Sequence, residues 1–364
     1  MRKEQITDRE AFCLLFLFIS GSTLILGIGA EAKNDAWMSA IVGALLVLPM
    51  ISIYARIISL FPGKDLFEIV ECVLGKVLGK IVSLIYIWYA FHLGAMVIRN
   101  FGAFIKTVAM PETPIRVSLL GLGLLCIYVV KSGVEVMARF STYLFPLVVV
   151  IIVVVQLLAI PSFEPEFLKP ILGNGLVPIL KGGYSAFTFP FAETILLTGA
   201  FFSLKNKKSP YKVYFPALLF TCLLIVALII RNIMILGGTI SFAYFPSHEA
   251  VSRIHVGDFI QRIELTVALV FMVGVFIKSA LCLLVASRGV ANVFKLQDYR
   301  SIVTQVGLLM IFLSEIVYED IMMMEYWAFK VYPYYVFPFQ VILPLAIWIT
   351  AEVRKKKLNC QSTV

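Results

Sequence analysis

Charged residues are scarce in this chain of 364 residues: Asp, Glu, Lys and Arg make up 15% of it, whereas 60% of it is hydrophobic. The mean hydropathy of +0.95 means that the chain carries more apolar surface than a soluble domain can bury. The composition therefore excludes an ordinary soluble domain and indicates that lipid is the solvent of this protein.

Histidine and cysteine are also few. The chain has three histidines, and His248 and His255 do not have the spacing of metal ligands. The six cysteines show no paired spacing, and most lie in apolar runs where a thiol behaves as a small hydrophobic group. The sequence thus predicts neither a disulfide framework nor a metal site.

Motifs of catalysis and of nucleotide binding are missing. Gly27-Ile28-Gly29 lacks a third glycine at the nucleotide-binding spacing and follows no expected strand. No nucleophile elbow and no metal-hydrolase motif occurs. The net charge of +9 would suggest nucleic acid for a soluble protein, but here the basic residues sort by side of the membrane. We expect no enzyme activity, no cofactor and no nucleic-acid partner.

What the chain has instead is a series of long apolar runs. A span needs roughly 20 apolar residues, because the hydrocarbon core is about 30 Å thick and a helix rises about 1.5 Å per residue. The first run has no convincing cleavage motif before a soluble domain, so we interpret it as a retained helix. The sequence predicts an all-α polytopic membrane protein with about ten spans, and nine or eleven remain alternatives. The spans lie near residues 11–30, 37–55, 81–105, 115–130, 140–160, 182–203, 213–230, 263–287, 302–318 and 333–352.

The basic residues indicate the orientation. With a cytoplasmic N-terminus, 20 of the 31 lysines and arginines fall on the inner side, among them those of residues 353–364. Inner segments of membrane proteins are enriched in Lys and Arg. We therefore expect a multi-pass protein with both termini cytoplasmic, an even number of spans, and a basic cytoplasmic tail at 353–364.

Two connections are longer than the others, at residues 56–80 and 231–262. They occupy equivalent places if the spans are divided as five plus five. Because five is odd, the second set begins on the opposite face of the membrane, so any repeat is inverted. We expect one transmembrane domain with repeats at 8–163 and 178–352, although no strong sequence identity links the halves.

The first span of each expected half is interrupted. Span one carries Gly21, Gly27 and Gly29, whereas span six carries two glycines followed by Pro190 within residues 187–193. Such breaks expose backbone groups at membrane depth, where half-helix ends suit the carboxylate and ammonium of a zwitterion such as an amino acid. The alternative is that these residues are close-packing sites or kinks, which are common in membrane helices.

Three of the ionisable residues inside the expected spans, where a charge is costly, are candidates for a functional role. Lys278 lies deep in span eight and either replaces a coupling cation or forms a structural ion pair, for which Glu193 is one partner. Glu193 has the same two interpretations. Arg99 either binds a ligand carboxylate or lies near the outer end of span three and reaches water.

Six short segments, in this order along nearly the whole chain, carry a resemblance to a known family: 32–37 (AKNDAW), 61–64 (FPGK), 111–114 (PETP), 189–193 (FPFAE), 245–246 (FP) and 257–264 (GDFIQRIE). Their order resembles that of the spore germination permeases. These are the membrane-embedded B subunits of germinant receptors, within the amino acid/polyamine/organocation transporter superfamily.

The resemblance implies a fold of ten helices in two inverted five-helix repeats, similar to the sodium-coupled leucine transporter. It implies a germinant-sensing role in the inner membrane of an endospore, beside an A subunit and a lipoprotein C subunit, with lipid around the chain. The chain departs from the family at Ala192, where a glycine is expected. Lys278 lies where some relatives have hydroxyl residues, which weakens the case for sodium binding.

The resemblance also implies which residues surround the ligand. Gly21 would lie at the unwound point of span one, residues 188–193 would form the break in span six, and Tyr89 would face the same cavity. The ligand-binding residues implied in this way are Gly21, Ser22, Tyr89, Thr188, Phe189, Phe191, Glu193, Ile277 and Ser279, with Lys278 and Arg99 as ion-coupling or structural charges.

Three functions remain open at this point. A receptor subunit would bind a small nutrient, such as an amino acid, at the bilayer midplane, and occupancy would bias one of two conformations. A permease would move the solute by alternating access, driven by protons or sodium. A structural subunit would only anchor its partners. The resemblance favours the receptor.

Overall fold

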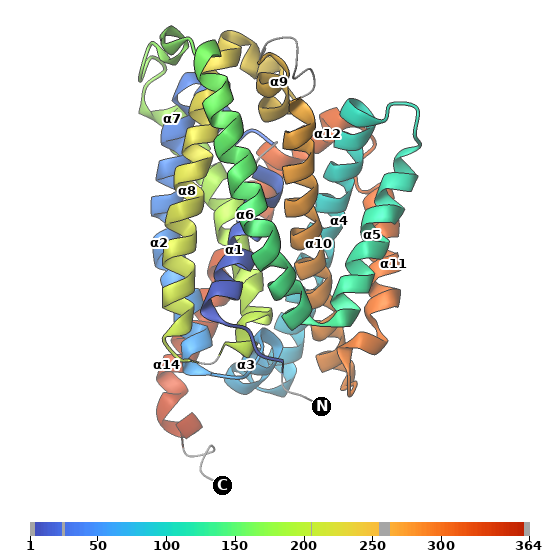
Figure 1. The fold of residues 1–364 in the computed structure, drawn as a ribbon. Helices are drawn as coiled ribbons and strands as arrows, with labels where there is room; N and C mark the ends of the chain where they lie inside the picture. Colours follow the sequence, from blue (N-terminus) through green and yellow to red (C-terminus); the bar gives the residue numbers. More distant parts are fainter. Residues whose placement is uncertain (1–3, 24–25, 205, 255–262, 360–364) are drawn as a thin grey trace.

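The computed structural model describes residues 4–23, 26–204, 206–254 and 263–359. Within these residues the chain is helical apart from its loops, and its one β-type contact is an isolated bridge between Ile6 and Leu204. The long helices run side by side along a common direction (Figure 1). The fold is therefore an all-helical bundle, as the sequence predicts.

The first half of the chain supplies five crossings and one short helix. Leucine, isoleucine and valine are abundant in most of these helices, which suits helices that face either lipid or other helices. Between the second and third crossings, Asp65 caps a nine-residue helix with a capping box completed by Glu68. The elements are α1 (Asp8–Thr23), η1 (Ala30–Asp35), α2 (Ala36–Leu60), α3 (Leu66–Leu74), α4 (Lys76–Phe104), η2 (Ile105–Ala109), α5 (Ile115–Ser132) and α6 (Val134–Ala159).

The second half is less regular, because prolines and glycines divide its first and last crossings. Its long uninterrupted helices are α8 (Ser209–Leu236) and α10 (Glu264–Phe294), followed by the shorter α11 (Val303–Ile316). The other elements are η3 (Ile160–Ser162), η4 (Pro165–Leu168), α7 (Leu176–Ala186), η5 (Phe187–Phe191), η6 (Ala192–Gly199), η7 (Phe201–Ser203), η8 (Gly237–Phe242), α9 (Pro246–Ser252), η9 (Tyr299–Ser301), α12 (Ile321–Tyr326), η10 (Trp327–Val331), α13 (Tyr332–Tyr335), η11 (Pro338–Ile342) and α14 (Leu343–Asn359).

Each of the ten expected spans coincides with helical structure in the described residues. Seven helical stretches there are long and apolar enough to cross a membrane, and α11 is a shorter apolar helix. The other two crossings are α1, which has 16 residues, and the divided run from α7 to η7. The two long connections expected at 56–80 and 231–262 hold the short helices α3 and α9, while residues 255–262 of the second lie outside the described residues.

Several boundaries differ from the expected ones. The first crossing was expected to reach residue 30, but α1 ends at Thr23. The fifth crossing begins at Val134 rather than at residue 140. The charged residues Glu135 and Arg139 belong to its first turns, where they form an ion pair one helical turn apart. The last begins with α12 rather than at residue 333, since prolines divide this crossing without ending it. The expected tail starts as helix, because α14 continues to Asn359.

The two halves start at opposite ends of the bundle. Figure 1 shows α1 beginning and α14 ending at the same end, whereas α7, which opens the second half, lies at the other end. We call the end that carries the start of α1 the basic end. A second half that starts on the opposite face after five crossings is the arrangement of an inverted repeat.

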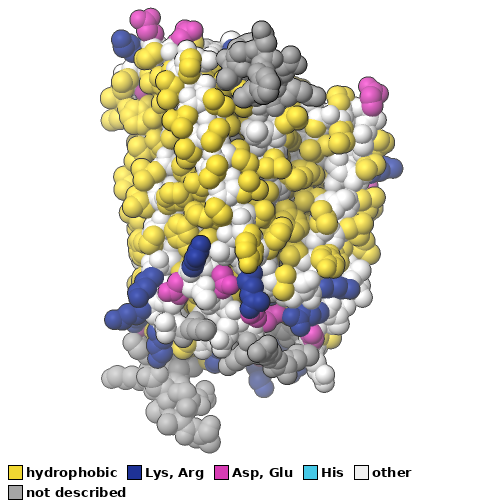
Figure 2. Space-filling model, in the orientation of Figure 1, with side chains coloured by type: hydrophobic (Ala, Val, Ile, Leu, Met, Phe, Trp, Pro, Cys, Tyr) yellow, Lys and Arg dark blue, Asp and Glu magenta, His cyan; other side chains and the backbone are white. Residues whose placement is uncertain are grey.

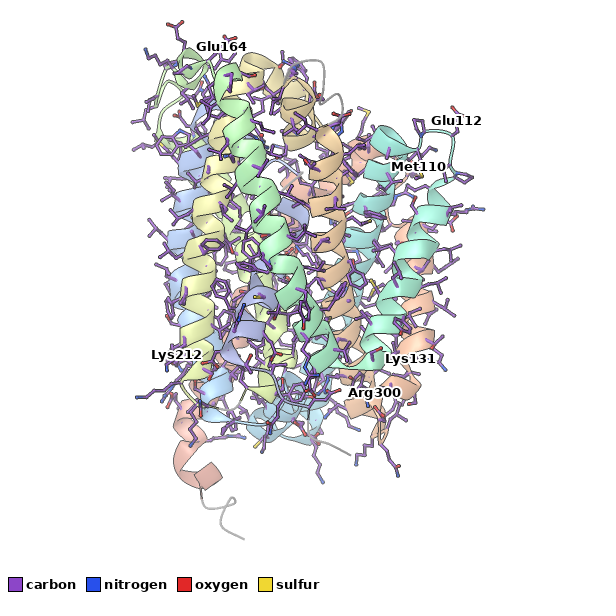
Figure 3. All side chains as sticks on the ribbon, viewed as in Figure 1. Met110, Glu112, Lys131, Glu164, Lys212 and Arg300 are labelled. Carbon is purple, nitrogen blue, oxygen red and sulfur yellow. The ribbon has the colours of Figure 1, made fainter. Side chains whose placement is uncertain are left out.

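The surface matches a protein that crosses a lipid bilayer. Figure 2 shows a wide apolar band on one face, with Lys and Arg side chains gathered below it toward the basic end. Lys131, Lys212 and Arg300 lie at this end, whereas Glu112 and Glu164 lie at the other (Figure 3). The exposed apolar side chains, among them Leu45, Leu124 and Leu219, belong to helices on the outside of the bundle. The chain is a multi-pass membrane protein.

Helix α10 forms the centre of the bundle. Its apolar window is the most buried of the seven long stretches, and it packs against α1, α4, α5 and α6. Helix α1 reaches α10 so closely that a Cβ atom on Gly21 would lie 2.5 Å from the carbonyl oxygen of Gly274. Small residues permit such close helix contacts in membranes. The crossing of α1 and α10 therefore fixes how α1 lies against the buried helix α10.

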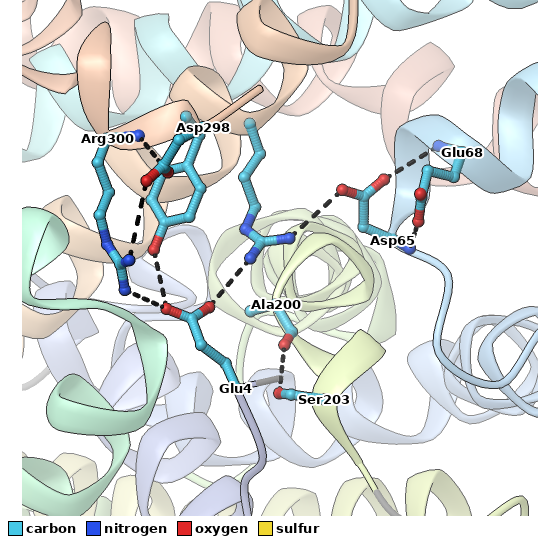
Figure 4. Close-up of polar contacts among 9 residues, drawn as sticks. Glu4, Asp65, Glu68, Ala200, Ser203, Asp298 and Arg300 are labelled. Atoms are coloured by element: carbon cyan, nitrogen blue, oxygen red, sulfur yellow. Dashed lines mark hydrogen bonds and ion pairs between the residues drawn. The ribbon is translucent and has the colours of Figure 1, made fainter. Parts of the chain in front are cut away.

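An ionic network around Glu4 ties the basic end together (Figure 4). Glu4 Oε2 accepts a hydrogen bond from Arg288 Nη2 at 3.1 Å, and Glu4 Oε1 accepts one from Arg300 Nη2 at 2.7 Å. Arg288 Nη1 lies 3.4 Å from Asp65 Oδ2, and the Arg288 guanidinium lies 3.8 Å from the centre of the Phe202 ring. Four segments that are distant in sequence thereby meet at one half-buried cluster.

Two further contacts complete this cluster. The Tyr299 hydroxyl donates a hydrogen bond to Glu4 Oε1 at 3.3 Å. Burial, with the Glu4 carboxylate acting in the same direction, raises the pKa of Tyr299 to about 12, so the hydroxyl stays protonated at neutral pH. The amide of Ile6 donates to the carbonyl of Ser203 at 3.2 Å, which attaches the N-terminal segment to the end of η7.

Replacing Glu4 with Gln is expected to lower the free energy of unfolding by about 2 kcal/mol, because the change removes one acceptor charge shared by two partly buried guanidinium groups. Thermal unfolding of the purified protein in detergent measures the effect. Glu135→Gln is the matched control, since Glu135 pairs with an exposed Arg139 and is expected to contribute less than about 1 kcal/mol. Equal unfolding temperatures for the two variants would contradict a stabilising role of the network.

Candidate functional site

The crossings that open the two halves are both interrupted, and they pack against each other. Gly29 has a φ of 66°, and α7 ends at Ala186 before Phe189, whose φ of −135° and ψ of 112° are not helical. A Cβ on Gly182 would lie 3.1 Å from the Cα of Gly29, so α7 packs directly on the interrupted segment of the first crossing. Helix α1 contacts both η5 and η6. Each interrupted segment thus packs against a regular helix of the opposite half.

A buried ion pair stands beside these interruptions. The ammonium of Lys278, on α10, donates a hydrogen bond to Oε2 of Glu193, on η6. The hydroxyl of Tyr332, on α13, donates to the other carboxylate oxygen, Oε1. The side chains of Glu193 and Lys278 have no exposed surface. Three crossings therefore meet at one carboxylate, and its charge is compensated inside the protein.

Aromatic rings surround the ammonium group on its other sides. Lys278 Nζ lies 5.4 Å from the centre of the Phe18 ring on α1 and 4.9 Å from that of Phe189. The face of an aromatic ring attracts a cation, and more strongly so where water is excluded. The Phe189 ring also meets the Tyr332 ring edge to face, with 6.3 Å between their centres. The break in the sixth crossing thus places one of its own rings over the cation.

A second buried group, Gln340 on η11, connects the same elements through neutral hydrogen bonds. Its side-chain nitrogen donates to the Tyr89 hydroxyl on α4 and to the carbonyl of Thr188 on η5, each at 2.9 Å. Tyr54 donates from its hydroxyl to the backbone carbonyl of Gln340 at 2.5 Å. A carbonyl released by the break is therefore satisfied by a side chain of the last crossing.

A small cavity of about 30 Å³ opens onto the carboxylate. Glu193, Phe189 and Tyr332 line it together with Asn100, whose Oδ1 atom is buried and has no hydrogen-bond partner in the described residues. A volume of this size holds about one water molecule. In this conformation the centre is therefore closed around its own charges.

The structure brings together five of the residues that the sequence singled out. Tyr89, Thr188, Phe189, Glu193 and Lys278 form the two connected clusters described above. The carboxylate of Glu193 accepts hydrogen bonds from the ammonium of Lys278 and the phenol of Tyr332 in an interior with no exposed surface. What this arrangement can do chemically is exchange one of these partners for a charged group of a bound solute.

The other predicted residues lie around these clusters. Ile277 and Ser279 flank Lys278 on buried sides of α10, and the Ser279 hydroxyl has no partner in the described residues. Phe191 is fully buried, and its carbonyl accepts a hydrogen bond from Thr194. Gly21 lies inside α1, two residues before its end at Thr23, and contacts Gly274. The side chain of Ser22 lies outside the described part of the structure.

Arg99 lies away from the centre. Its Nη2 atom donates to the backbone carbonyls of Tyr318 at 2.7 Å and Glu319 at 3.2 Å, in the loop that follows α11. These partners fit the interpretation in which Arg99 reaches toward the end of the bundle. Among the described residues, no group of three or more His, Cys, Asp and Glu residues could hold a metal ion.

Sequence reasoning missed Tyr332 and Gln340. The expected last span began one residue after Tyr332, and the buried contacts of that residue with Glu193 join elements 139 positions apart. Gln340 is a polar residue in an apolar run, and a lone polar side chain at membrane depth is a signal of a buried contact. The sequence therefore indicates Gln340 as a candidate for a buried contact, but it does not indicate that Tyr89 and Thr188 are its partners.

The fold defines the class of protein. The structure resembles that of MhsT in complex with L-phenylalanine, with a TM-score of 0.62 and 13% identity over 96% of this chain and 99% of that one. It also resembles Mhp1, a nucleobase-cation-symport-1 family transporter in a closed conformation with bromovinylhydantoin bound, with a TM-score of 0.67 and 9% identity over 87% of this chain and 73% of that one. The chain has the leucine-transporter-like fold of ten helices in two inverted five-helix repeats.

Sequence comparison defines the family. The profile of the family described as "Spore germination protein" matches residues 5–321, and the chain belongs to this family. Spore germination protein KB of Bacillus subtilis (strain 168) is 28% identical over 362 residues, which cover 98% of this chain and 97% of that protein. Spore germination protein YndE of the same strain is 26% identical over 271 residues, 72% of each chain. Spore germination protein XB of Bacillus anthracis is 25% identical over 264 residues, 69% of this chain and 70% of that protein.

Proposed function

We propose that the chain is the membrane-embedded B subunit of a germinant receptor, which binds a small nutrient such as an amino acid near the bilayer midplane and triggers spore germination. Membership of the spore germination family supports the germination role. The observation that carries the binding role is the buried Glu193, which meets Lys278 and Tyr332 where the two interrupted crossings touch. The proposal assigns no enzyme activity to the chain.

The proposal includes the surroundings of the subunit. The basic end would face the cytoplasm, with both termini and the tail at 353–364 on that side, because Lys and Arg gather there. The membrane would be the inner membrane of the spore, and the partners would be an A subunit and a lipoprotein C subunit. The repeats would cover residues 8–163 and 178–352.

The central charges suggest how occupancy is detected. Two opposite charges that neutralise each other hold α10, η6 and α13 together, and a ligand that takes over either charge changes the balance between two conformations. A ligand shifts this balance only by the difference between its affinities for the two states. The Glu193 cluster is then the two-state element that partner subunits read.

A second candidate function is amino acid transport by proton-coupled or sodium-coupled alternating access. The observation that favours it is the fold, which this chain shares with Mhp1, a solved transporter, and with MhsT, each of which holds a small solute. Receptor and transporter need the same kind of pocket, so only a functional measurement separates them.

Spores lacking the gene are tested against single amino acids, sugars and salts, and uptake of the responsive solute is followed in parallel. Lost germination with normal uptake supports the receptor, whereas lost uptake with normal germination supports the permease.

Tyr332→Phe tests the central cluster within a spore that otherwise responds. The change removes one charge-assisted hydrogen bond to Glu193 and is expected to shift the half-maximal germinant concentration about tenfold. Tyr334→Phe is the matched control, because Tyr334 is 73% exposed and two residues away. Identical dose–response curves for the two variants, at equal protein abundance, would remove the central cluster from the proposal.

A further inference from the structure

The central cavity raises the question of where a solute first binds. It has a volume of about 30 Å³, and the charges beside it are already engaged with each other. A zwitterionic solute needs more room than one water molecule and needs partners that are free. The first contact with such a solute must therefore occur at another site in this conformation.

A larger cavity of about 220 Å³ lies next to the central one. Two of the elements that line it, α9 and α12, lie at the end opposite the basic end (Figure 1). It is enclosed by the interrupted first crossing, the end of α8, η8 with the start of α9, and the α12–η10 segment. Leu26 and Ala328 line both cavities, so the two are separated by little more than these side chains. We call the larger cavity the outer pocket.

Two opposite charges line the outer pocket. Lys33 comes from η1, which joins the first crossing to the second, and Glu325 comes from α12 in the last crossing. Both are exposed, and neither side chain makes a hydrogen bond or ion pair within the described residues. They differ in this respect from Glu193 and Lys278, which are paired and buried. The pocket thus offers one free cation and one free anion from opposite ends of the chain.

The rest of the lining fits the body of a small organic solute. Asn232, Ser241 and Tyr244 contribute polar groups, and most of the remaining wall is apolar. The segment from Leu26 to Ala30 contributes irregular backbone, whose groups are not all used by a helix. Pockets for drug-sized ligands begin near about 300 Å³, so a cavity somewhat below that size suits a smaller solute.

We propose that the outer pocket binds a small α-amino acid as a zwitterion, with its carboxylate at Lys33 and its ammonium at Glu325. The inference rests on the proposed function and names the place where the nutrient first binds. Binding there holds the segment that follows the first crossing against the last crossing. The first and last crossings carry side chains of the central cluster, Phe18 and Tyr332. The occupied outer pocket and the central ion pair are thereby mechanically connected.

The test measures binding of the twenty L-amino acids, one at a time, to the purified full-length chain in lipid nanodiscs. Lys33→Met and Glu325→Gln are each expected to weaken the binding of the responsive amino acid by about ten- to a hundredfold. Its methyl ester and its N-acetyl derivative, which each lack one charge, are expected to lose affinity to a similar extent. Lys330→Met and Glu319→Gln are matched controls, since both residues are exposed at the same end and neither lines the pocket.

Each outcome has a definite meaning. Unchanged binding in both pocket variants overturns the outer pocket, as does binding that Tyr332→Phe weakens and Lys33→Met does not, since the site is then central. If none of the amino acids binds, the zwitterion assignment is wrong. The germination screen of gene-deleted spores tests the proposed function separately from the outer pocket. A normal germination response of these spores to every nutrient tested refutes the proposed function.

Discussion

Glu193→Gln is expected to destabilise the protein by about 3–5 kcal/mol, because Lys278 would remain in the interior without a counter-charge. Lys278→Met is expected to cost a similar amount, since it leaves the carboxylate with the Tyr332 hydroxyl alone. In the double variant Glu193→Leu/Lys278→Met both charges are removed, and the loss should be much smaller than the sum of the single losses. Thermal unfolding in detergent, read as a double-mutant cycle, measures these differences.

An exposed pair serves as the control for this cycle. Glu315 accepts from Arg116 at 2.5 Å, but the Arg116 side chain is 72% exposed, so Glu315→Gln is expected to cost less than about 1 kcal/mol. Additive losses for the Glu193 and Lys278 variants would show that the two charges do not depend on each other. Germination by spores that carry the double variant decides the role of the pair: a lost response at normal abundance assigns it to signalling, and a normal response leaves it a structural role only.

Gly21→Ala and Gly274→Ala are each expected to destabilise the protein by about 1–3 kcal/mol. A Cβ on Gly21 would lie 2.5 Å from the carbonyl oxygen of Gly274, and a Cβ on Gly274 would lie 2.5 Å from the Cα of Gly21. Both neighbours are backbone atoms and cannot rotate away, so α1 and α10 must separate. A larger residue such as leucine at position 21 is expected to prevent accumulation of the folded protein, which a membrane-fraction assay measures.

Gly121→Ala provides the comparison, because Gly121 lies inside α5 and a Cβ there would meet nothing within 4 Å. Alanine is the better helix former, so this change should be neutral or stabilising by up to about 1 kcal/mol. The double variant Gly21→Ala/Gly274→Ala should lose less than the sum of its parts, since the first substitution already separates the helices. If Gly21→Ala unfolds at the same temperature as Gly121→Ala, the close crossing of α1 and α10 is not needed for stability.

Much of the fold could be predicted, because each crossing carries its own signal. A run of apolar residues reports a span irrespective of what packs on it, since the hydrocarbon core requires every span to bury its polar backbone internally. The ends of spans were predicted less well. Helix α8 continues to Leu236 and contains Arg231 and Asn232, whose side chains are buried. Their burial is tolerated in part because Arg231 donates to the Asn232 side chain at 2.8 Å.

The candidate site could be predicted only in part. Lys278 and Glu193 stand out in the sequence, because charges inside apolar runs need partners, and Pro190 marks the break beside them. Tyr332 does not stand out in the same way, since tyrosine is tolerated at span ends, and the polar Gln340 in an apolar run indicates a position but not its partners. Gly21 is an intermediate case: its place near the first break was expected, whereas its contact with Gly274 depends on how two distant helices cross.

The sequence by itself determined that this protein crosses the membrane many times, that its basic residues gather on one side and that two of its crossings are interrupted. These properties follow from local composition, because a run of apolar residues, a charge or a proline has the same effect wherever its neighbours come from. Only the tertiary structure decided that Glu193 meets both Lys278 and Tyr332, and that Lys33 and Glu325 line one pocket. Such meetings depend on side-chain directions and helix crossings between segments far apart in the chain, and neither is encoded in a local pattern.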